Sequence, residues 1–269
     1  MNESRGVRVA SVNREEEFYF GWQPKMPRRQ AFFMAGVVVV LFLFAAGLAA
    51  LLVCSQNPFA PAVFESLMPR TFQGVVVTTP YPALLVLRPG VAGEVAALSR
   101  YLLVGRGKHG VQQEMTSWQG RAVKLRGRLI YRDQKTLLEV VPGSITALTP
   151  VDATLVARAD SLPSYSLGSF TLAGEIVDSK CYFGMMKPGE LKTHRACAVR
   201  CISGGIPPVF VVRDQDGQAI YLLLVSAQGR SVNAEILHLI AEPLVISGEI
   251  VQHGDWLVLQ ADPKTYRRS

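Results

Sequence analysis

Charged side chains are scarce in this sequence. Lys, Arg, Asp and Glu make up 18% of the 269 residues, whereas hydrophobic residues make up 49%. Disordered chains combine low hydrophobicity with high net charge, so this composition excludes a chain that is mostly disordered. The apolar excess is concentrated in residues 31–53, where AFFMAGVVVVLFLFAAGLAALLV contains no charged residue. We therefore examine this run as a membrane segment and the remainder as a folded region.

Several catalytic and cofactor-binding motifs are also missing. The sequence has no C-x-x-C and no C-x-x-C-H, which disfavours a thioredoxin-type active site and covalent haem attachment. It has no G-x-S-x-G nucleophile elbow, no phosphate-binding loop and no clear pair of catalytic carboxylates. No stripe of basic and aromatic residues of the kind that binds single-stranded nucleic acid stands out. We therefore assign no catalytic residue and expect no nucleic-acid partner.

The apolar run over residues 31–53 has the length of a transmembrane helix. Its 23 residues, at about 1.5 Å each, cross a hydrocarbon core of about 30 Å. A cleaved signal peptide usually has a shorter apolar core with small residues before the cleavage site, and here Val53 precedes Cys54. The run is thus predicted to be an uncleaved single-pass anchor.

The charges beside the run predict its orientation. Lys25, Arg28 and Arg29 lie just before it, and the first basic residue after it is Arg70. Basic flanks remain on the cytoplasmic side of a membrane. Residues 1–30 are therefore predicted to be a cytoplasmic tail. The protein is expected in the bacterial inner membrane, with the domains that follow the helix in the periplasm.

An internal repeat predicts the architecture after the helix. Three segments recur in the same order in both halves: TFQGVVVTTP with TLAGEIVDSK, SRYLLVGRGKHG with AIYLLLVSAQGR, and AVKLRGRLIYRDQKTLLEV with PLVISGEIVQHGDWLVLQA. They are rich in Val, Ile and Leu and alternate apolar with polar or small residues, as strands do. Gly74 matches Gly174, and Gly127 matches Gly248. A glycine within a strand predicts a bend where the sheet curls.

Each copy also has a short stretch typical of a helix before its last two strands, at residues 110–118 and 231–240, with Ser231 as a plausible cap of the second. This order resembles the five-stranded OB barrel, although tandem β-sandwich domains would give a similar pattern. The predicted fold is a single N-terminal transmembrane helix followed by mainly β structure, namely two tandem OB-like barrels that each carry a short helix. The predicted linker, first domain, connector and second domain are residues 54–69, 70–148, 149–166 and 167–265.

The two copies differ in one place. In the first copy, Tyr101 follows Gly74 by 27 positions, whereas in the second Tyr221 follows Gly174 by 47. The second copy therefore carries an insertion after its first strand, over residues 181–205, and this insertion holds three of the four cysteines. A segment added to a complete scaffold points to function more strongly than a core segment does.

The insertion predicts a cluster of metal-binding or redox-active side chains. THRACAVRCISGG indicates a short helix, with Thr193 as N-cap and the Gly-Gly pair as its end. One histidine and two cysteines stand at i, i+3 and i+7 on one face of this helix, and a third cysteine at the end of the preceding strand can close over that face. The candidate metal ligands are Cys181, His194, Cys197 and Cys201.

Three interpretations of this cluster remain open. Three thiolates and one imidazole form a set that suits zinc. Copper is the second candidate, because Met185 and Met186 would add thioether sulfurs that suit Cu(I) better than zinc. In an oxidising compartment cysteines tend to pair, so a disulfide is the interpretation that the compartment favours, with Cys181 bonded to Cys197 or Cys201 and one thiol left over. A thiol-redox site is the third interpretation. Asp178, three residues before Cys181, is placed to orient His194 or Lys180 or to end the strand.

The second copy, with GEIVDSKC followed by H-x-x-C-x-x-x-C-I-S-G-G, resembles small exported bacterial domains with the pattern G-x-x-x-D-x-x-C…H-x-x-C-x-x-x-C-x-x-x-G. The matching positions are Gly174, Asp178, Cys181, His194, Cys197, Cys201 and Gly205. The resemblance implies that these residues act together, but it brings no assigned activity. It also suggests an association with respiratory oxidoreductases.

On this basis we expect a membrane-anchored accessory or assembly subunit of a membrane-associated complex, with a protein partner. An electron-transfer complex is the candidate. The loop would bind zinc or copper or be closed by a disulfide. The alternatives are a non-catalytic OB-type binding module and a thiol-redox protein or metallochaperone. An enzymatic activity is not expected.

Overall fold

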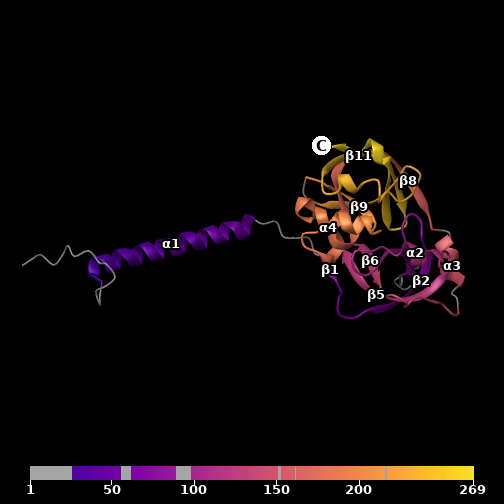
Figure 1. Ribbon diagram of the computed structural model, residues 1–269, viewed down its shortest axis with the longest axis horizontal. Coiled ribbons are helices and arrows are strands. Elements are labelled where there is room, and N and C mark those ends of the chain that lie inside the picture. Colours follow the sequence, from indigo (N-terminus) through magenta and orange to yellow (C-terminus); the bar gives the residue numbers. More distant parts are fainter. Residues whose placement is uncertain (1–25, 56–61, 89–97, 151–152, 161, 216) are drawn as a thin grey trace, which may run out of the picture. The chain divides into compact units, whose positions relative to one another are not determined.

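The computed structural model (Figure 1) describes residues 26–55, 62–88, 98–150, 153–160, 162–215 and 217–269. The chain divides into two compact units, Met1–Pro58 and Phe59–Ser269. Residues 1–25 of the predicted cytoplasmic tail lie outside the described residues.

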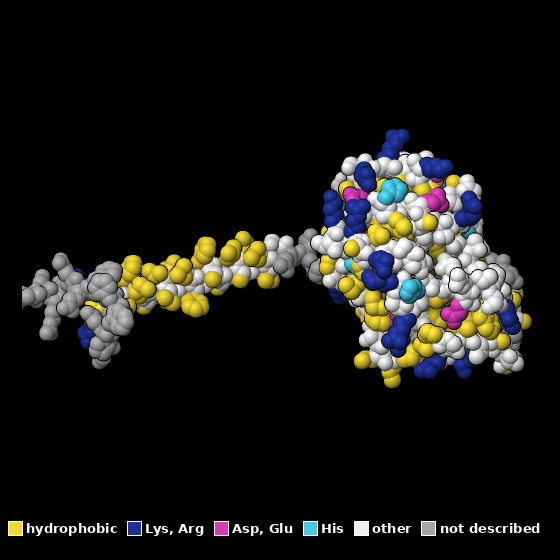
Figure 2. Space-filling model, viewed as in Figure 1, with side chains coloured by type: hydrophobic (Ala, Val, Ile, Leu, Met, Phe, Trp, Pro, Cys, Tyr) yellow, Lys and Arg dark blue, Asp and Glu magenta, His cyan; other side chains and the backbone are white. Residues whose placement is uncertain are grey.

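The first unit contains the apolar helix α1 (Arg28–Ser55), which includes the predicted run and extends slightly beyond it at both ends. None of its residues is buried, and apolar side chains line it in the view of Figure 2. Its 28 residues are about 42 Å long at the α-helical rise. The helix is therefore long and apolar enough to cross a membrane.

The first barrel has the strand connections of an OB fold. β2 pairs with β3, β3 with β4, β4 with β6 in parallel, β6 with β5, and β5 returns to β2. The helix α2 (Gln112–Thr116) lies between the third and fourth strands. The five strands are β2 (Arg70–Val77), β3 (Ala83–Leu87), β4 (Leu98–Val104), β5 (Ala122–Arg132) and β6 (Lys135–Val140).

Two short strands extend this sheet beyond the barrel. β1 (Ala62–Phe64) and β7 (Thr146–Ala147) both pair with β5. β1 lies within the predicted linker, so part of that segment is sheet.

The second barrel repeats the same connections. Its first strand pairs with the second and fourth, and its third pairs with the fifth in parallel. The helix α3 (Ala153–Asp160) precedes it. The five strands are β8 (Ser164–Asp178), β9 (Pro208–Arg213), β10 (Ala219–Val225), β11 (Pro243–His253) and β12 (Trp256–Gln260). The 3-10 turn η4 (Pro263–Thr265) and β13 (Arg267–Arg268), which pairs with β11, follow. The prediction of two tandem OB-like barrels is confirmed.

The prediction of a helix over residues 231–240 is wrong. Only the 3-10 turn η3 (Leu237–Leu239) forms there, and Ser231 Oγ bonds to Asn233 rather than capping a helix. The Asn233 side chain instead donates to the main-chain oxygens of Ile202 and Ile206 at 2.7 and 2.9 Å. These bonds hold the segment against the end of the helix that contains Ile202. The apolar side chains of the segment pack into the core from successive turns.

The glycines predicted to mark strand bends lie where a strand changes partner. β2 pairs with β5 up to Val75 and with β3 from Val75 onward, so Gly74 lies at the change. A Cβ atom at Gly74 would lie 2.3 Å from the main-chain oxygen of Leu85. Gly174 has the same relation to Val211 in the second barrel, also at 2.3 Å. A side chain at either position would push the strands apart.

The two barrels share a third hydrophobic core in addition to the core inside each of them. Strands β3, β4, β9 and β10 bury one face inside their own barrel and the other between the barrels. This double burial explains why they read as continuous apolar runs such as YLLV and YLLLV rather than as strict alternation. The inter-barrel core consists of Tyr81, Ala83, Leu102, Val104, Ile130, Leu137, Val177, Cys181, Tyr182, Phe183, Cys201, Ile206, Val209, Val211, Tyr221, Leu223, Val225, Trp256 and Val258.

Candidate metal centre

The insertion lies between β8 and β9, where residues 179–207 replace the short loop of residues 78–82 in the first barrel. It contains a π-helical turn, η2 (Cys181–Met185), and the helix α4 (Leu191–Ser203). In Figure 1, α4 (orange) lies at the junction of the two barrels.

The π-helical turn packs between the barrels rather than on the outside of one. Cys181, Tyr182 and Phe183 are buried in the inter-barrel core. A Cβ atom at Gly184 would lie 2.5 Å from the main-chain oxygen of Val63 in β1. The insertion is therefore a wedge that joins the two domains, and it is not the simple surface addition that the repeat comparison suggested.

The helix α4 presents one face to this junction. It ends at Ser203 with Gly204 as its C-cap, as predicted, but its N-cap is Glu190, so the prediction of Thr193 as cap is wrong. The N–H of Leu191, in the first turn, donates to Glu175 Oε1 at 2.6 Å. A carboxylate from β8 thus takes the place of the expected hydroxyl cap. No local sequence pattern predicts this contact, because Glu175 lies in another element.

Three sulfur atoms come together at the junction. Cys181 Sγ lies 3.9 Å from Cys197 Sγ and 3.9 Å from Cys201 Sγ, and all three sulfurs lie within 4.8 Å of one another. Cys181 and Cys201 are buried and Cys197 is half-buried. A disulfide requires about 2.05 Å between sulfurs, so the predicted disulfide is not supported. The side chains surround a common point and do not form a bonded pair.

His194 is directed to a carboxylate. Its Nε2 lies 3.0 Å from Asp178 Oδ2, and both side chains are buried. Asp178 Oδ1 also accepts the N–H of Cys181 at 2.8 Å. Asp178, Cys181 and His194 form a second group of possible ligands within 4.8 Å of one another. The four predicted ligands thus fall into two overlapping groups that share Cys181.

A lysine from the first barrel reaches the sulfur cluster. Lys108, in the loop after β4, donates from Nζ to Cys197 Sγ at 2.8 Å, and this bond raises the pKa of Lys108. Within the cluster, the hydrogen bond between Cys181 and Cys201 raises the pKa of Cys181 and lowers that of Cys201, and burial adds to the rise at Cys181. Sequence reasoning missed Lys108, because it lies in the copy of the repeat that has no cysteine.

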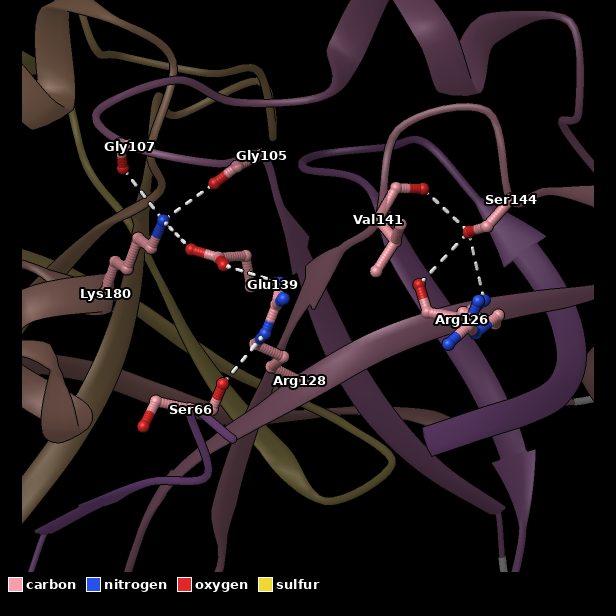
Figure 3. A network of polar contacts seen from close by, with 9 residues as sticks. All are labelled: Ser66, Gly105, Gly107, Arg126, Arg128, Glu139, Val141, Ser144 and Lys180. Carbon is pink, nitrogen blue, oxygen red and sulfur yellow. Dashed lines mark hydrogen bonds and ion pairs between the residues drawn. The ribbon is translucent and has the colours of Figure 1, made fainter. Parts of the chain in front are cut away.

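A buried lysine fixes the position of the Lys108 loop, as Figure 3 shows. Lys180, with a side-chain exposure of 1%, donates to the main-chain oxygens of Gly105 and Gly107 at 2.7 and 2.8 Å. Its Nζ also lies 2.6 Å from Glu139 Oε2 in β6. Arg128 lies 3.5 Å from the other oxygen of Glu139. The residue next to Cys181 is thereby tied to the first barrel.

The same loop touches the end of α4 through its backbone. The N–H of Gly110 donates to the main-chain oxygen of Gly204 at 2.8 Å. A Cβ atom at Gly204 would lie 2.0 Å from the oxygen of Lys108, and one at Gly110 would lie 2.4 Å from the oxygen of Gly205. The glycine pair after the last cysteine therefore allows the two domains to approach closely.

Comparison with known proteins gives no family for this chain. No family model and no curated protein matches it. A crystal structure of a deletion mutant of the single-stranded DNA binding protein from Thermus aquaticus is similar at 15% identity and a TM-score of 0.22, covering 75% of this chain and 94% of that chain. The assignment of the barrels accordingly rests on their strand order and pairing.

Proposed function

We propose that this protein is a membrane-anchored accessory or assembly subunit that holds a soft metal ion between Cys181, Cys197 and Cys201. The spacing of the three sulfurs carries the proposal. Thiolates bound at about 2.3 Å to one ion lie about 3.8–4.0 Å apart in tetrahedral or trigonal geometry. The 3.9 Å separations from Cys181 fit that spacing and are too long for a disulfide.

The three thiolates favour binding of Cu(I), and with a fourth ligand they could also bind zinc. Soft thiolates select Cu(I) and Zn(II), and Cu(I) is satisfied by three of them. Structural zinc sites almost always have four ligands, so zinc would need His194 as well. A ligating histidine usually has a carboxylate on its other nitrogen. Asp178 contacts Nε2 of His194, so Nδ1 would be the nitrogen that binds zinc.

The remaining chemistry would come from the surroundings of the ion. Cys181 and Cys201 are buried, so water has limited access to two of the three ligands. Cys197 is half-buried and gives the side of the cluster from which an ion can enter or leave. Such an arrangement suits a subunit that receives, keeps or passes on an ion.

The location of the site is part of the proposal. The helix α1 would anchor the chain in the bacterial inner membrane, with the tail in the cytoplasm because Arg28 and Arg29 precede the apolar run. The barrels would then lie in the periplasm beside a membrane complex, and an electron-transfer complex is the partner that we favour.

Metal content and thiol counting on the full chain, purified in detergent under reducing conditions, test this function. We expect about one ion per chain, with the three clustered thiols protected from alkylation until a chelator is added. The double variant Cys197→Ala, Cys201→Ala should lose the ion. The matched control Cys54→Ala, which removes the exposed cysteine of α1, should keep it.

Other outcomes would contradict the proposal in distinct ways. Metal-free protein with one protected disulfide would indicate a structural bridge. Metal-free protein with one rapidly alkylated thiol among the three clustered cysteines would indicate thiol-redox chemistry. The variant His194→Gln separates the two ions, because zinc binding should depend on the imidazole and Cu(I) binding should survive its loss.

A further inference from the structure

We infer that the first barrel completes the metal centre, with Lys108 as a charge-compensating residue that determines which ion the three sulfurs retain. This inference rests on the proposed function and adds to it a specificity-determining residue. It also assigns a role to the barrel that contributes no ligand.

The loop that carries Lys108 is held at several points. The N–H of Gly105 donates to the oxygen of His109 at 2.8 Å, which closes the loop on itself. Lys180 binds the oxygens of Gly105 and Gly107, and Gly110 is bonded to α4. Lys108 stands between these anchors, so its contact with the sulfur comes from a positioned loop.

The residues around Lys108 do not draw its ammonium group away from the sulfur cluster. Lys108 lines a small cleft of about 360 Å³ in which the charged and titratable side chains are basic, and none of the described lining residues is acidic. No carboxylate of the cleft therefore competes with Cys197 for the ammonium group. The lining residues are Lys108, His109, Arg200, Ser203 and Gly204.

Charge then distinguishes the two candidate ions. Three thiolates leave two negative charges with Cu(I) and one with Zn(II). A neighbouring cation stabilises the more negative complex more strongly, because Coulomb attraction scales with the product of the charges. The free thiols are neutral and release their three protons when either ion binds, so Lys108 should favour Cu(I) over Zn(II), and a neutral side chain at this position should shift the preference toward Zn(II).

Competition against chromogenic chelators, with Cu(I) and Zn(II) measured separately on the full chain, tests this role. Lys108 is exposed, which reduces the effect of its charge, so for Lys108→Met we expect a loss of Cu(I) affinity of about threefold to fivefold. The loss for Zn(II) should be smaller. Lys108→Arg should retain the preference. Lys192→Met, which removes an exposed charge from the first turn of α4, should match the wild type.

The possible results separate the two proposals. If the wild type binds neither ion, the proposed function fails and the inference fails with it. If the wild type binds an ion and Lys108→Met leaves the Cu(I)-to-Zn(II) ratio unchanged, the inference alone is overturned. An equal loss for both ions would also overturn it, since this would mean that Lys108 only holds the loop. Hydrogen exchange at the Gly110 amide shows whether the loop stays docked.

Discussion

Replacing Lys180 by Met tests how the two barrels are joined. The substitution keeps an unbranched side chain of similar length and removes the ammonium group. Glu139, with a side-chain exposure of 6%, then loses a partner at 2.6 Å. The main-chain oxygens of Gly105 and Gly107 lose their donor as well.

The size of the effect follows from burial. Removing one partner of a buried ion pair costs about 3–5 kcal/mol, because the remaining charge stays in a poorly solvated place. Arg128 lies 3.5 Å from Glu139 and is itself 29% exposed, so part of the charge remains compensated. We therefore expect a loss near the lower end, about 3 kcal/mol in the free energy of unfolding. For a unit of this size that corresponds to a decrease in Tm of about 6–12 °C.

Urea and thermal unfolding of the full chain, followed by circular dichroism, measure this loss. Lys192→Met is the matched control and should be neutral, because Lys192 is exposed. The double variant Lys180→Met, Glu139→Leu should be less destabilised than Lys180→Met alone, since it leaves no buried charge. A loss below about 1 kcal/mol for Lys180→Met would refute the reasoning, because exposed pairs contribute that little.

Two further predictions concern the contacts between the barrels. Gly204→Ala should lower the free energy of unfolding in urea by about 1–3 kcal/mol, because its Cβ would meet the oxygen of Lys108 at 2.0 Å. The control Gly107→Ala, with φ of 69° but open space around the Cβ, should lower it by only about 1 kcal/mol. Equal losses for the two variants would contradict the close approach at Gly204. Burial raises the pKa of Tyr81, whose hydroxyl donates to Leu224, to about 12. The unfolded chain ionises near pH 10, so stability from Tyr81 is complete below pH 10 and falls by about 3 kcal/mol between pH 10 and 12. Tyr81→Phe should therefore reduce the alkaline loss of stability, to which other buried tyrosines also contribute, and an unchanged pH profile would argue against this role of Tyr81.

Most of the fold could be predicted from the internal repeat, because the strands of each barrel have patterns that are visible within short stretches of sequence. Matched strands, matched glycines and the apolar run are patterns within single elements, and a sequence displays them directly. The helix over residues 231–240 failed for the opposite reason: the bonds from Asn233 to Ile202 and Ile206 come from an element distant in sequence. The cap of α4 by Glu175 is a tertiary contact of the same kind.

The candidate site was only partly predictable. The spacing of His194, Cys197 and Cys201 placed them on one helical face, but it could not show that the imidazole is directed to Asp178. Lys108 could not be found from the insertion, because it belongs to the other barrel. The sequence suggested Asp178 as a partner of Lys180 and did not indicate its contact with Glu139 of the first barrel. A lysine that is 1% exposed is recognisable only once the packing around it is known.

The first barrel has no cysteine, but its packing against the second barrel brings it into contact with the sulfur cluster. Cys181 and Cys201 belong to the core shared by both barrels, and Lys108 reaches the third sulfur from the first barrel. If the three cysteines bind an ion, docking of the barrels adds the contact from Lys108 to the bound site, so ion binding and docking stabilise each other. An occupied site would therefore favour the docked arrangement of the two barrels over the separated one.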